Sequence, residues 1–176
     1  GSTNKIYSCA NSSGILAGRT NCIKTESKNA IIVGGNCNTL SAIGGFLGGG
    51  NKNKIHGYGA DNSVLVGGDS NFLSGGLRNF IGGGFRNSIE GLKTCQSFIG
   101  GGRSNKIFSC NTSTIAGGCG NEINGSFNTI GGGSGNKLLI GSSCSVIVGG
   151  CGNQASKMLV TIGGGCGNSI TAFKSL

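Results

Sequence analysis

One short pattern recurs along the whole chain and limits what the chain can fold into. The residues at 161–170 read Thr-Ile-Gly-Gly-Gly-Cys-Gly-Asn-Ser-Ile, and similar copies lie at 129–138, 114–123, 98–107 and, more loosely, 14–23. The asparagine of this pattern recurs at intervals of 15 to 18 residues, about 16 residues per repeat. Repeats of this length are shorter than those of the helical repeat families and match single coils of a β-solenoid.

Two aliphatic positions keep a fixed distance from the repeated asparagine. One lies two residues after it, as in Ile107, and the other lies six residues before it, as in Ile99. This spacing predicts two short strands per coil, each with one side chain pointing inward. The differences in repeat length fall between the two strands, for example at 58–62 and 92–96. We therefore expect an all-β fold, a parallel β-solenoid or β-roll of about ten coils of ~16 residues.

Glycines precede the asparagine at nearly constant positions. The third residue before it is glycine in all ten full copies, and the fourth is glycine in all but one, where Ala17 stands. This predicts a turn whose dihedral angles or close packing exclude a side chain. A phosphate-binding loop is excluded, because no lysine and no helix follow the glycines at the required spacing.

The asparagine itself is expected to close this turn with its side-chain amide. Copies in neighbouring coils would then form a ladder along the solenoid axis. The predicted ladder consists of Asn21, Asn38, Asn53, Asn71, Asn87, Asn105, Asn121, Asn136, Asn153 and Asn168.

Apolar residues also occupy positions that should point outward. The seventh residue before the asparagine is apolar in six of ten copies. Side chains alternate between the two faces of a strand, so the fifth residue before the asparagine should also point outward, and it is apolar at Leu16, Val33, Val66 and Val148. A thin coil cannot cover such a stripe, so we expect a partner surface, most economically a second copy with the same period. The alternative is that these are ordinary exposed apolar residues. The predicted interface residues are Ile31, Phe46, Val64, Phe80, Phe98 and Val146.

Composition narrows the class of partner. The chain has 39 glycines, no proline and a net charge of +9, but its basic residues stand singly in the sequence, which argues against a nucleic-acid partner. The nine cysteines are interpreted as small, buriable packing residues, with a disulfide framework as the alternative, and their odd count leaves at least one thiol unpaired within the chain. No Cys-x-x-Cys pair accompanies the single histidine, so no metal site is predicted. No apolar run is long enough for membrane insertion.

Residues 1–2 are interpreted as an expression-tag remnant, and 3–176 as one repeat domain cut from a longer fibre protein.

The motifs Asn62-Ser-Val-Leu-Val-Gly-Gly68 and Ser145-Val-Ile-Val-Gly-Gly150 resemble the head repeats of trimeric autotransporter adhesins. The Ile-Gly-Gly-Gly-x-x-Asn motif is similar to β-roll repeats of phage and large-virus fibre proteins. These resemblances imply a left-handed parallel β-roll, a homotrimer, and an attachment module on a virion or an extracellular cell surface. The longer coils and nine cysteines depart from the adhesin heads.

A second resemblance is to the β-roll antifreeze proteins of grasses. Thr114, Thr129 and Thr161 share one outward position, as an ice-binding face requires, but Phe80 and Phe98 interrupt the row. A monomeric ice-binding β-roll is therefore the alternative function.

No enzymatic activity and no cofactor are predicted. Of the five acids, only Asp61 and Asp69 could meet across one coil as the carboxylate pair that glycoside cleavage needs. Cys-His chemistry is limited to His56, whose nearest cysteine in the sequence, Cys37, is about one coil away, and no base-orienting group is evident. A host-surface receptor, protein or glycan, is instead expected to contact the loops that interrupt the repeat. The residues predicted for this contact are Tyr58, Lys93 and Lys157.

Overall fold

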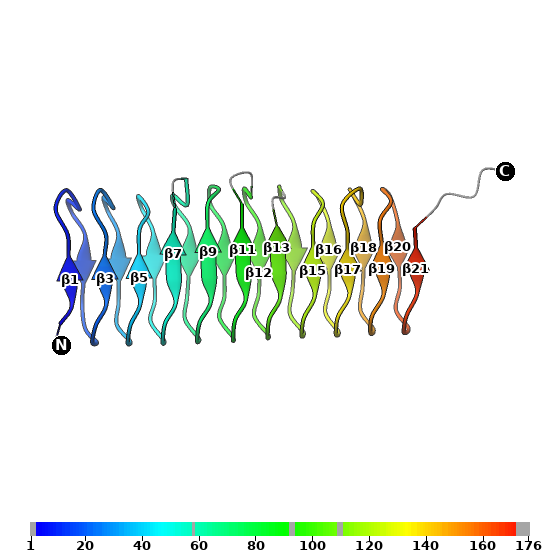
Figure 1. Ribbon diagram of the computed structural model, residues 1–176, viewed down its shortest axis with the longest axis horizontal. Coiled ribbons are helices and arrows are strands. Elements are labelled where there is room, and N and C mark those ends of the chain that lie inside the picture. The colour runs from blue at the N-terminus through cyan, green and yellow to red at the C-terminus, as the bar shows by residue number, and fades with distance from the viewer. Residues whose placement is uncertain (1–2, 58, 92–93, 109–110, 172–176) are drawn as a thin grey trace.

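The computed structural model describes residues 3–57, 59–91, 94–108 and 111–171, which wind into a two-sheet parallel β-solenoid (Figure 1). The chain rises through the near sheet and descends through the far sheet as it advances from the N-terminus, so the coil is left-handed. This confirms the predicted all-β solenoid of about ten coils of ~16 residues. Within the described ranges, no helix is long and apolar enough to cross a membrane.

An eleven-stranded sheet contains the strands that follow each repeated asparagine. Each strand pairs in parallel with the equivalent strand of the next coil, as Ile89 pairs with Ile107. The strands are β1 (Lys5–Ile6), β3 (Cys22–Ile23), β5 (Thr39–Leu40), β7 (Lys54–His56), β9 (Phe72–Ser74), β11 (Ser88–Glu90), β13 (Lys106–Phe108), β15 (Glu122–Ile123), β17 (Lys137–Leu138), β19 (Gln154–Ala155) and β21 (Ser169–Ile170).

A ten-stranded sheet contains the strands that precede each glycine run. Its register is equally regular, with Ile81 opposite Ile99. The strands are β2 (Gly14–Ile15), β4 (Ile31–Ile32), β6 (Phe46–Leu47), β8 (Val64–Leu65), β10 (Phe80–Ile81), β12 (Phe98–Ile99), β14 (Thr114–Ile115), β16 (Thr129–Ile130), β18 (Val146–Ile147) and β20 (Thr161–Ile162).

The core consists of the two predicted aliphatic rows, one from each sheet. From Ile23 to Ala155 every residue of both rows is 0 % exposed. Neighbouring coils place like residues opposite each other, so the rows form continuous aliphatic stacks between the sheets. Burying one such isoleucine or leucine contributes about 1.5–3 kcal/mol.

The two edges of the solenoid differ in regularity. We call the edge between each ten-stranded-sheet strand and the next eleven-stranded-sheet strand the turn edge, and the opposite edge the loop edge. The turn edge has the same shape in every coil, whereas the loop edge varies in length (Figure 1). Of the predicted insertions at 58–62 and 92–96, residues 59–62 and 94–96 lie on the loop edge, and 58, 92 and 93 lie outside the described residues.

From Gly18 to Gly150, the third residue before each asparagine is a glycine that must remain glycine on two counts. Gly118 has φ +89°, which disfavours L side chains, and a Cβ there would lie less than 3.0 Å from the backbone oxygen of Gly133 in the next coil. Both predicted reasons for this glycine are therefore confirmed. The glycine before it is different, because nothing lies within 4 Å of a Cβ at Gly117.

From Asn21 to Asn153 the repeated asparagines lie in one buried line beside the turn edge, and Asn168 at the end of this line is exposed. Asn105 is typical: its Nδ2 donates to the backbone oxygens of Gly101 (2.9 Å) and, in the next coil, Gly118 (3.0 Å). Its Oδ1 accepts the backbone N–H of Asn121 at 3.0 Å. Each such amide closes its own turn and joins two coils, mostly through side-chain-to-backbone bonds. Direct amide-to-amide bonds also occur, from Asn71 Nδ2 to Asn53 Oδ1 at 3.2 Å and from Asn168 Nδ2 to Asn153 Oδ1 at 2.9 Å.

A second polar ladder, which the sequence analysis missed, lies at the start of the ten-stranded-sheet strands. Here Asn79 donates its backbone N–H to Ser63 Oγ at 3.0 Å, and Asn79 Oδ1 accepts the N–H of Ser97 at 2.9 Å. The line continues through Ser113, Asn128 and Ser145, all buried. Both sheets are therefore fixed to their neighbours by a buried polar line as well as by strand pairing.

Candidate interaction face

The outer face of the ten-stranded sheet is chemically uniform along the whole solenoid. It consists of two rows, the first residue of each strand and the residue after each strand, and we call it the uncharged face. The twenty residues of these rows are Gly, Ala, Thr, Val, Ile, Leu or Phe, and none is polar beyond a threonine hydroxyl. This is notable in a chain with 19 charged side chains, 14 basic and 5 acidic.

The predicted interface residues all lie on this face. Ile31, Phe46 and Phe98 are 36–40 % exposed, and Val64, Phe80 and Val146 are half-buried against their neighbours in the row. The second row adds four more exposed apolar side chains: Leu16, Val33, Val66 and Val148. The structure thus brings these residues together in two adjacent files, while what covers them stays a prediction.

Three phenylalanines lie flat along the face because each is followed, two residues later, by glycine. Ring carbons of Phe46, Phe80 and Phe98 come within 3.3–3.4 Å of the place a Cβ would take at Gly48, Gly82 and Gly100. The rings of Phe80 and Phe98 also stack, with centroids 5.1 Å apart and planes 7° apart. Such a stack contributes about 0.5–1.5 kcal/mol beyond burial and keeps the rings in one orientation.

The face changes along the axis. The strands from β4 to β12 carry bulky residues, whereas β14 to β20 carry Thr114, Thr129, Val146 and Thr161. In this second part the other row is mostly small, with Ala116, Gly131 and Gly163. The face is therefore aromatic and aliphatic toward one end and small with threonine toward the other.

The cysteines are not packing residues, so that interpretation was wrong. Among the eight cysteines that the structure describes, all are free thiols and none is buried. Their positions explain this, since Cys119, Cys151 and Cys166 lie on the turn edge and the inward rows are filled by isoleucine and leucine. The ninth, Cys110, lies outside the described residues.

Native-state alkylation should therefore label the exposed thiols. We expect iodoacetamide to modify Cys9, Cys144, Cys151 and Cys166 in the folded protein without changing its circular dichroism, because these side chains face solvent. Peptide mapping by mass spectrometry gives the extent at each site. Labelling that begins only after denaturant is added would show that these thiols are covered.

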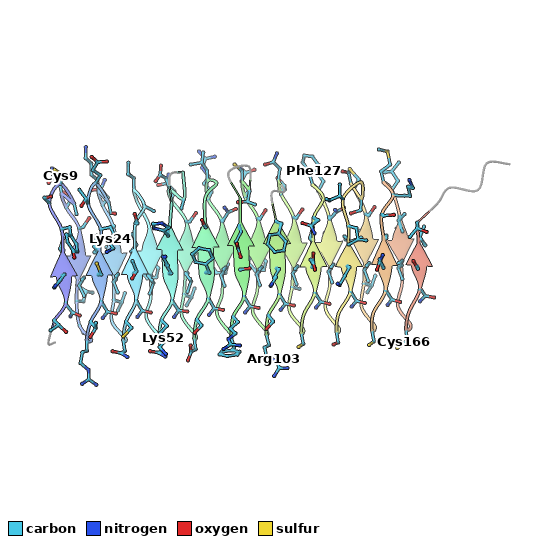
Figure 2. The ribbon with its side chains drawn as sticks, in the orientation of Figure 1. Cys9, Lys24, Lys52, Arg103, Phe127 and Cys166 are labelled. Atoms are coloured by element: carbon cyan, nitrogen blue, oxygen red, sulfur yellow. The ribbon has the colours of Figure 1, made fainter. Side chains whose placement is uncertain are left out.

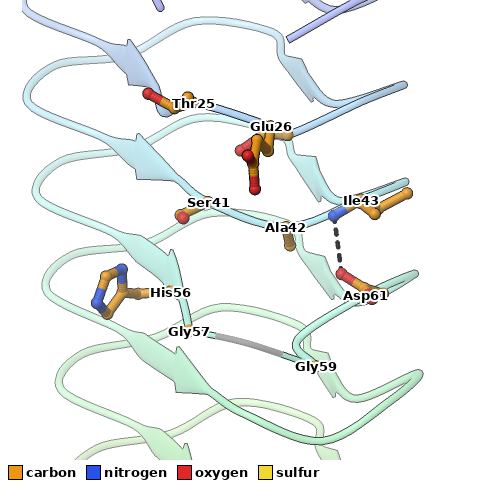
Figure 3. Close-up of a pocket in the computed structure, with 10 residues that line it drawn as sticks. Thr25, Glu26, Ser41, Ala42, Ile43, His56, Gly57, Gly59 and Asp61 are labelled. Carbon is orange, nitrogen blue, oxygen red and sulfur yellow. Dashed lines mark hydrogen bonds between the residues drawn. The ribbon is translucent and has the colours of Figure 1, made fainter. Parts of the chain in front are cut away.

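The loop edge holds a shallow pocket of about 300 Å³ (Figure 3). The His56 ring and the Asp61 carboxylate lie on opposite sides of it, and Asp61 accepts the backbone N–H of Ile43 at 2.9 Å. Partial burial, together with Lys54 and Lys24, lowers the pKa of His56, which keeps its imidazole neutral at pH 7. The described residues include no group of three or more His, Cys, Asp or Glu side chains able to hold a metal ion.

The one carboxylate pair that the sequence allowed is not formed. Asp61 lies on the loop edge, bonded to Ile43, whereas Asp69 lies on the turn edge, bridged between Asn51 and Phe85. Asp61 precedes β8 and Asp69 follows it, so a spacing of eight residues places the two acids at opposite edges of the solenoid instead of bringing them together.

The expected receptor contacts are only partly described. Lys157 lies on the loop edge, between β19 and β20, and is half-buried. Tyr58 and Lys93 lie outside the described residues. Beyond the geometry, comparison with known proteins adds no assignment: no protein-family model and no curated protein matches the chain.

Proposed function

We propose that this protein is a structural and attachment module of a fibre or surface adhesin, a stiff rod that self-associates through the uncharged face. The observation that carries this proposal is the continuity of that face, which runs over all ten strands of its sheet without a charged residue. Isolated apolar residues on a monomer are usually scattered, and contiguous patches usually mark an interface.

A second copy of the chain is the partner that best fits this surface. Its strands have the same spacing, so side chains of two parallel rods can interdigitate in the same register along the whole length. Ten strands at ~4.8 Å give a length of ~48 Å, and with a width of ~10 Å two faces in contact would bury on the order of 1,000 Å², the lower end for a specific interface.

Three copies are favoured over two by the resemblance to trimeric adhesin heads and virus fibres. Around a threefold axis, each chain would contact one neighbour with each of its two rows, so both files would be covered. The varied loop edge would then face outward, where attachment loops on a virion or cell surface need to be.

Replacing Phe98 by lysine should convert the oligomer into single chains. The charge would lie in the middle of the uncharged face, where burying it against another apolar face costs several kcal/mol. Light scattering on a sizing column should give three chain masses for the unmodified protein and one for Phe98→Lys, with unchanged circular dichroism. The control is Phe72→Lys at an equivalent outward position of the other sheet, which should leave the mass at three chains.

Other masses of the unmodified protein would each contradict part of the proposal. An unmodified protein of two chain masses would keep the face as the interface and contradict the threefold arrangement. A single chain mass at high concentration would contradict self-association altogether. In that case the threonine part of the face, with Thr114, Thr129 and Thr161 in one row, favours the ice-binding alternative, and thermal hysteresis would decide it.

A further inference from the structure

Basic residues that stand singly in the sequence gather on two adjoining surfaces of the fold. The turn edge carries Arg19, Lys52, Arg86 and Arg103, and all four are exposed. The outer face of the eleven-stranded sheet carries five lysines: Lys5, Lys24, Lys54, Lys106 and Lys137. We call these two surfaces together the basic side.

The basic side holds most of the charge of the molecule. Against its nine basic residues stand three acids, Asp69, Glu90 and Glu122, which leaves six of the nine net positive charges of the chain on this side. The described loop-edge residues are nearly balanced, with Lys28, Arg78 and Lys157 against Glu26 and Asp61. Charge is therefore concentrated opposite the uncharged face, although the sequence spacing indicated a scattered distribution.

The cations of the turn edge lie along a line. Figure 2 shows Lys52 and Arg103 projecting from the same edge of the rod, the edge opposite Cys9 and Phe127. From the coil of Arg19 to that of Arg103 there are five coil intervals, about 24 Å at the usual strand spacing. None of the four makes an ion pair with another described residue. They can therefore all be offered to one extended ligand that runs parallel to the axis.

Asp69, the single acid of the turn edge, accepts hydrogen bonds from two neutral side chains. Ser70 Oγ donates to Asp69 at 2.5 Å and Asn51 Nδ2 donates to it at 3.2 Å. These two bonds lower the pKa of Asp69, and the charges of Lys52 and Arg86 lower it further to a smaller extent. Asp69 thus remains ionised, but it pairs directly with neither cation and does not remove them from the surface.

Four aromatic rings of the basic side each have a cation over one face. Lys24 lies over Tyr7 at 5.1 Å, Lys54 over Phe72 at 5.6 Å, Arg86 over Phe85 at 4.8 Å and Lys106 over Phe108 at 5.9 Å. Proteins that bind single-stranded nucleic acids use open rings on which bases stack. Tyr7 (44 % exposed) and Phe85 (38 % exposed) still reach solvent, but a cation already lies over each of these rings, so the aligned cations favour a polyanion that has no bases.

We propose that the basic side binds a linear sulfated polysaccharide. The inference rests on the proposed attachment function and names the ligand class, because sulfated glycans are polyanions found on cell surfaces. It also moves the contact from the loop edge, where the sequence predicted it, to the turn edge and the neighbouring sheet face.

The test is binding of a heparin oligosaccharide, measured by calorimetry at several salt concentrations. We expect Lys52→Gln with Arg103→Gln to weaken binding about tenfold at low salt and to reduce the slope of log affinity against log salt by about one per residue. The matched control is Lys28→Gln with Arg78→Gln, which removes the same charge from the loop edge and should change affinity less than about twofold. Asp69→Asn should tighten binding, since it removes the only acid of the turn edge.

Three outcomes would overturn the proposal. These are equal losses in the two double variants, no salt dependence, or tighter binding of a single-stranded oligonucleotide of the same charge than of the heparin fragment. The chain mass of each variant, measured on the same samples, separates this result from the proposed self-association. A trimer that ignores heparin contradicts only the ligand, whereas a monomer that binds heparin contradicts only the assembly.

Discussion

Gly118→Ala is expected to destabilise the solenoid by about 3–5 kcal/mol. The φ of +89° is costly for alanine, and its Cβ would meet the backbone oxygen of Gly133 at less than 3.0 Å. That oxygen cannot move away on its own, because it accepts hydrogen bonds from the backbone N–H of Cys119 and from Asn121 Nδ2. The two coils must therefore separate. Chemical denaturation followed by circular dichroism, at one fixed protein concentration, measures the loss.

The adjacent glycine provides the matched control. A Cβ at Gly117 has nothing within 4 Å, and the equivalent residue in the first full copy is already alanine, Ala17. Gly117→Ala should therefore change the free energy of unfolding by no more than about 0.5 kcal/mol, with a small gain possible because alanine restricts the unfolded chain. If both variants lost the same stability, the effect would come from glycine content in general and not from the close approach of the coils.

The fold could be predicted because its two determinants are strictly periodic. Aliphatic residues two after and six before the asparagine gave both inward rows, and the glycine three before it gave the turn. These positions tolerate almost no variation, since every coil faces the same packing and the same close approach to the next coil. Because each coil repeats the same residue types at the same positions, ten copies of one pattern support the same prediction.

The second polar ladder could not be found in the same way. Its positions hold serine at five places, asparagine at Asn79 and Asn128, and Ala30, Gly45 and Val160 elsewhere in the row. The serines are Ser13, Ser63, Ser97, Ser113 and Ser145. Either side chain supplies the acceptor for the next coil, so the chemistry repeats while the residue type does not. A search for one recurring residue misses such a line, whereas aligning the eighth position before each asparagine would have shown it.

The distribution of charge on the surface could not be predicted without knowing at which position of the coil each charged residue lies. Lys52 and Arg86 are 34 residues apart in sequence, yet only two coils separate them on the turn edge. The cysteine interpretation failed for the same reason, because it used the usual burial of cysteine and not its place in the coil. Once positions are known, the rod has two distinct surfaces, an uncharged one that we propose binds another copy and a basic one that we propose binds a polyanion.

Asn105→Ala is expected to lower the free energy of unfolding by about 3–4 kcal/mol, the second largest effect. Three hydrogen bonds disappear in a fully buried place, and the backbone oxygen of Gly101 and the N–H of Asn121 lose their partner. The loss should also be local, because coils in a solenoid contact only their neighbours. Hydrogen exchange of the Asn121 amide should accelerate far more than exchange in the first coils.

Asn36→Ala is the control for this substitution, since Asn36 also bonds to an asparagine of the next coil. Its Nδ2 donates to Asn51 Oδ1 at 3.2 Å, but the pair is exposed on the turn edge and water can replace the bond. A change within about 0.5 kcal/mol is expected there. If Asn36→Ala were as damaging as Asn105→Ala, the number of amide bonds between coils would matter and their burial would not. If Asn105→Ala were neutral, the aliphatic stacks alone would hold the coils in register.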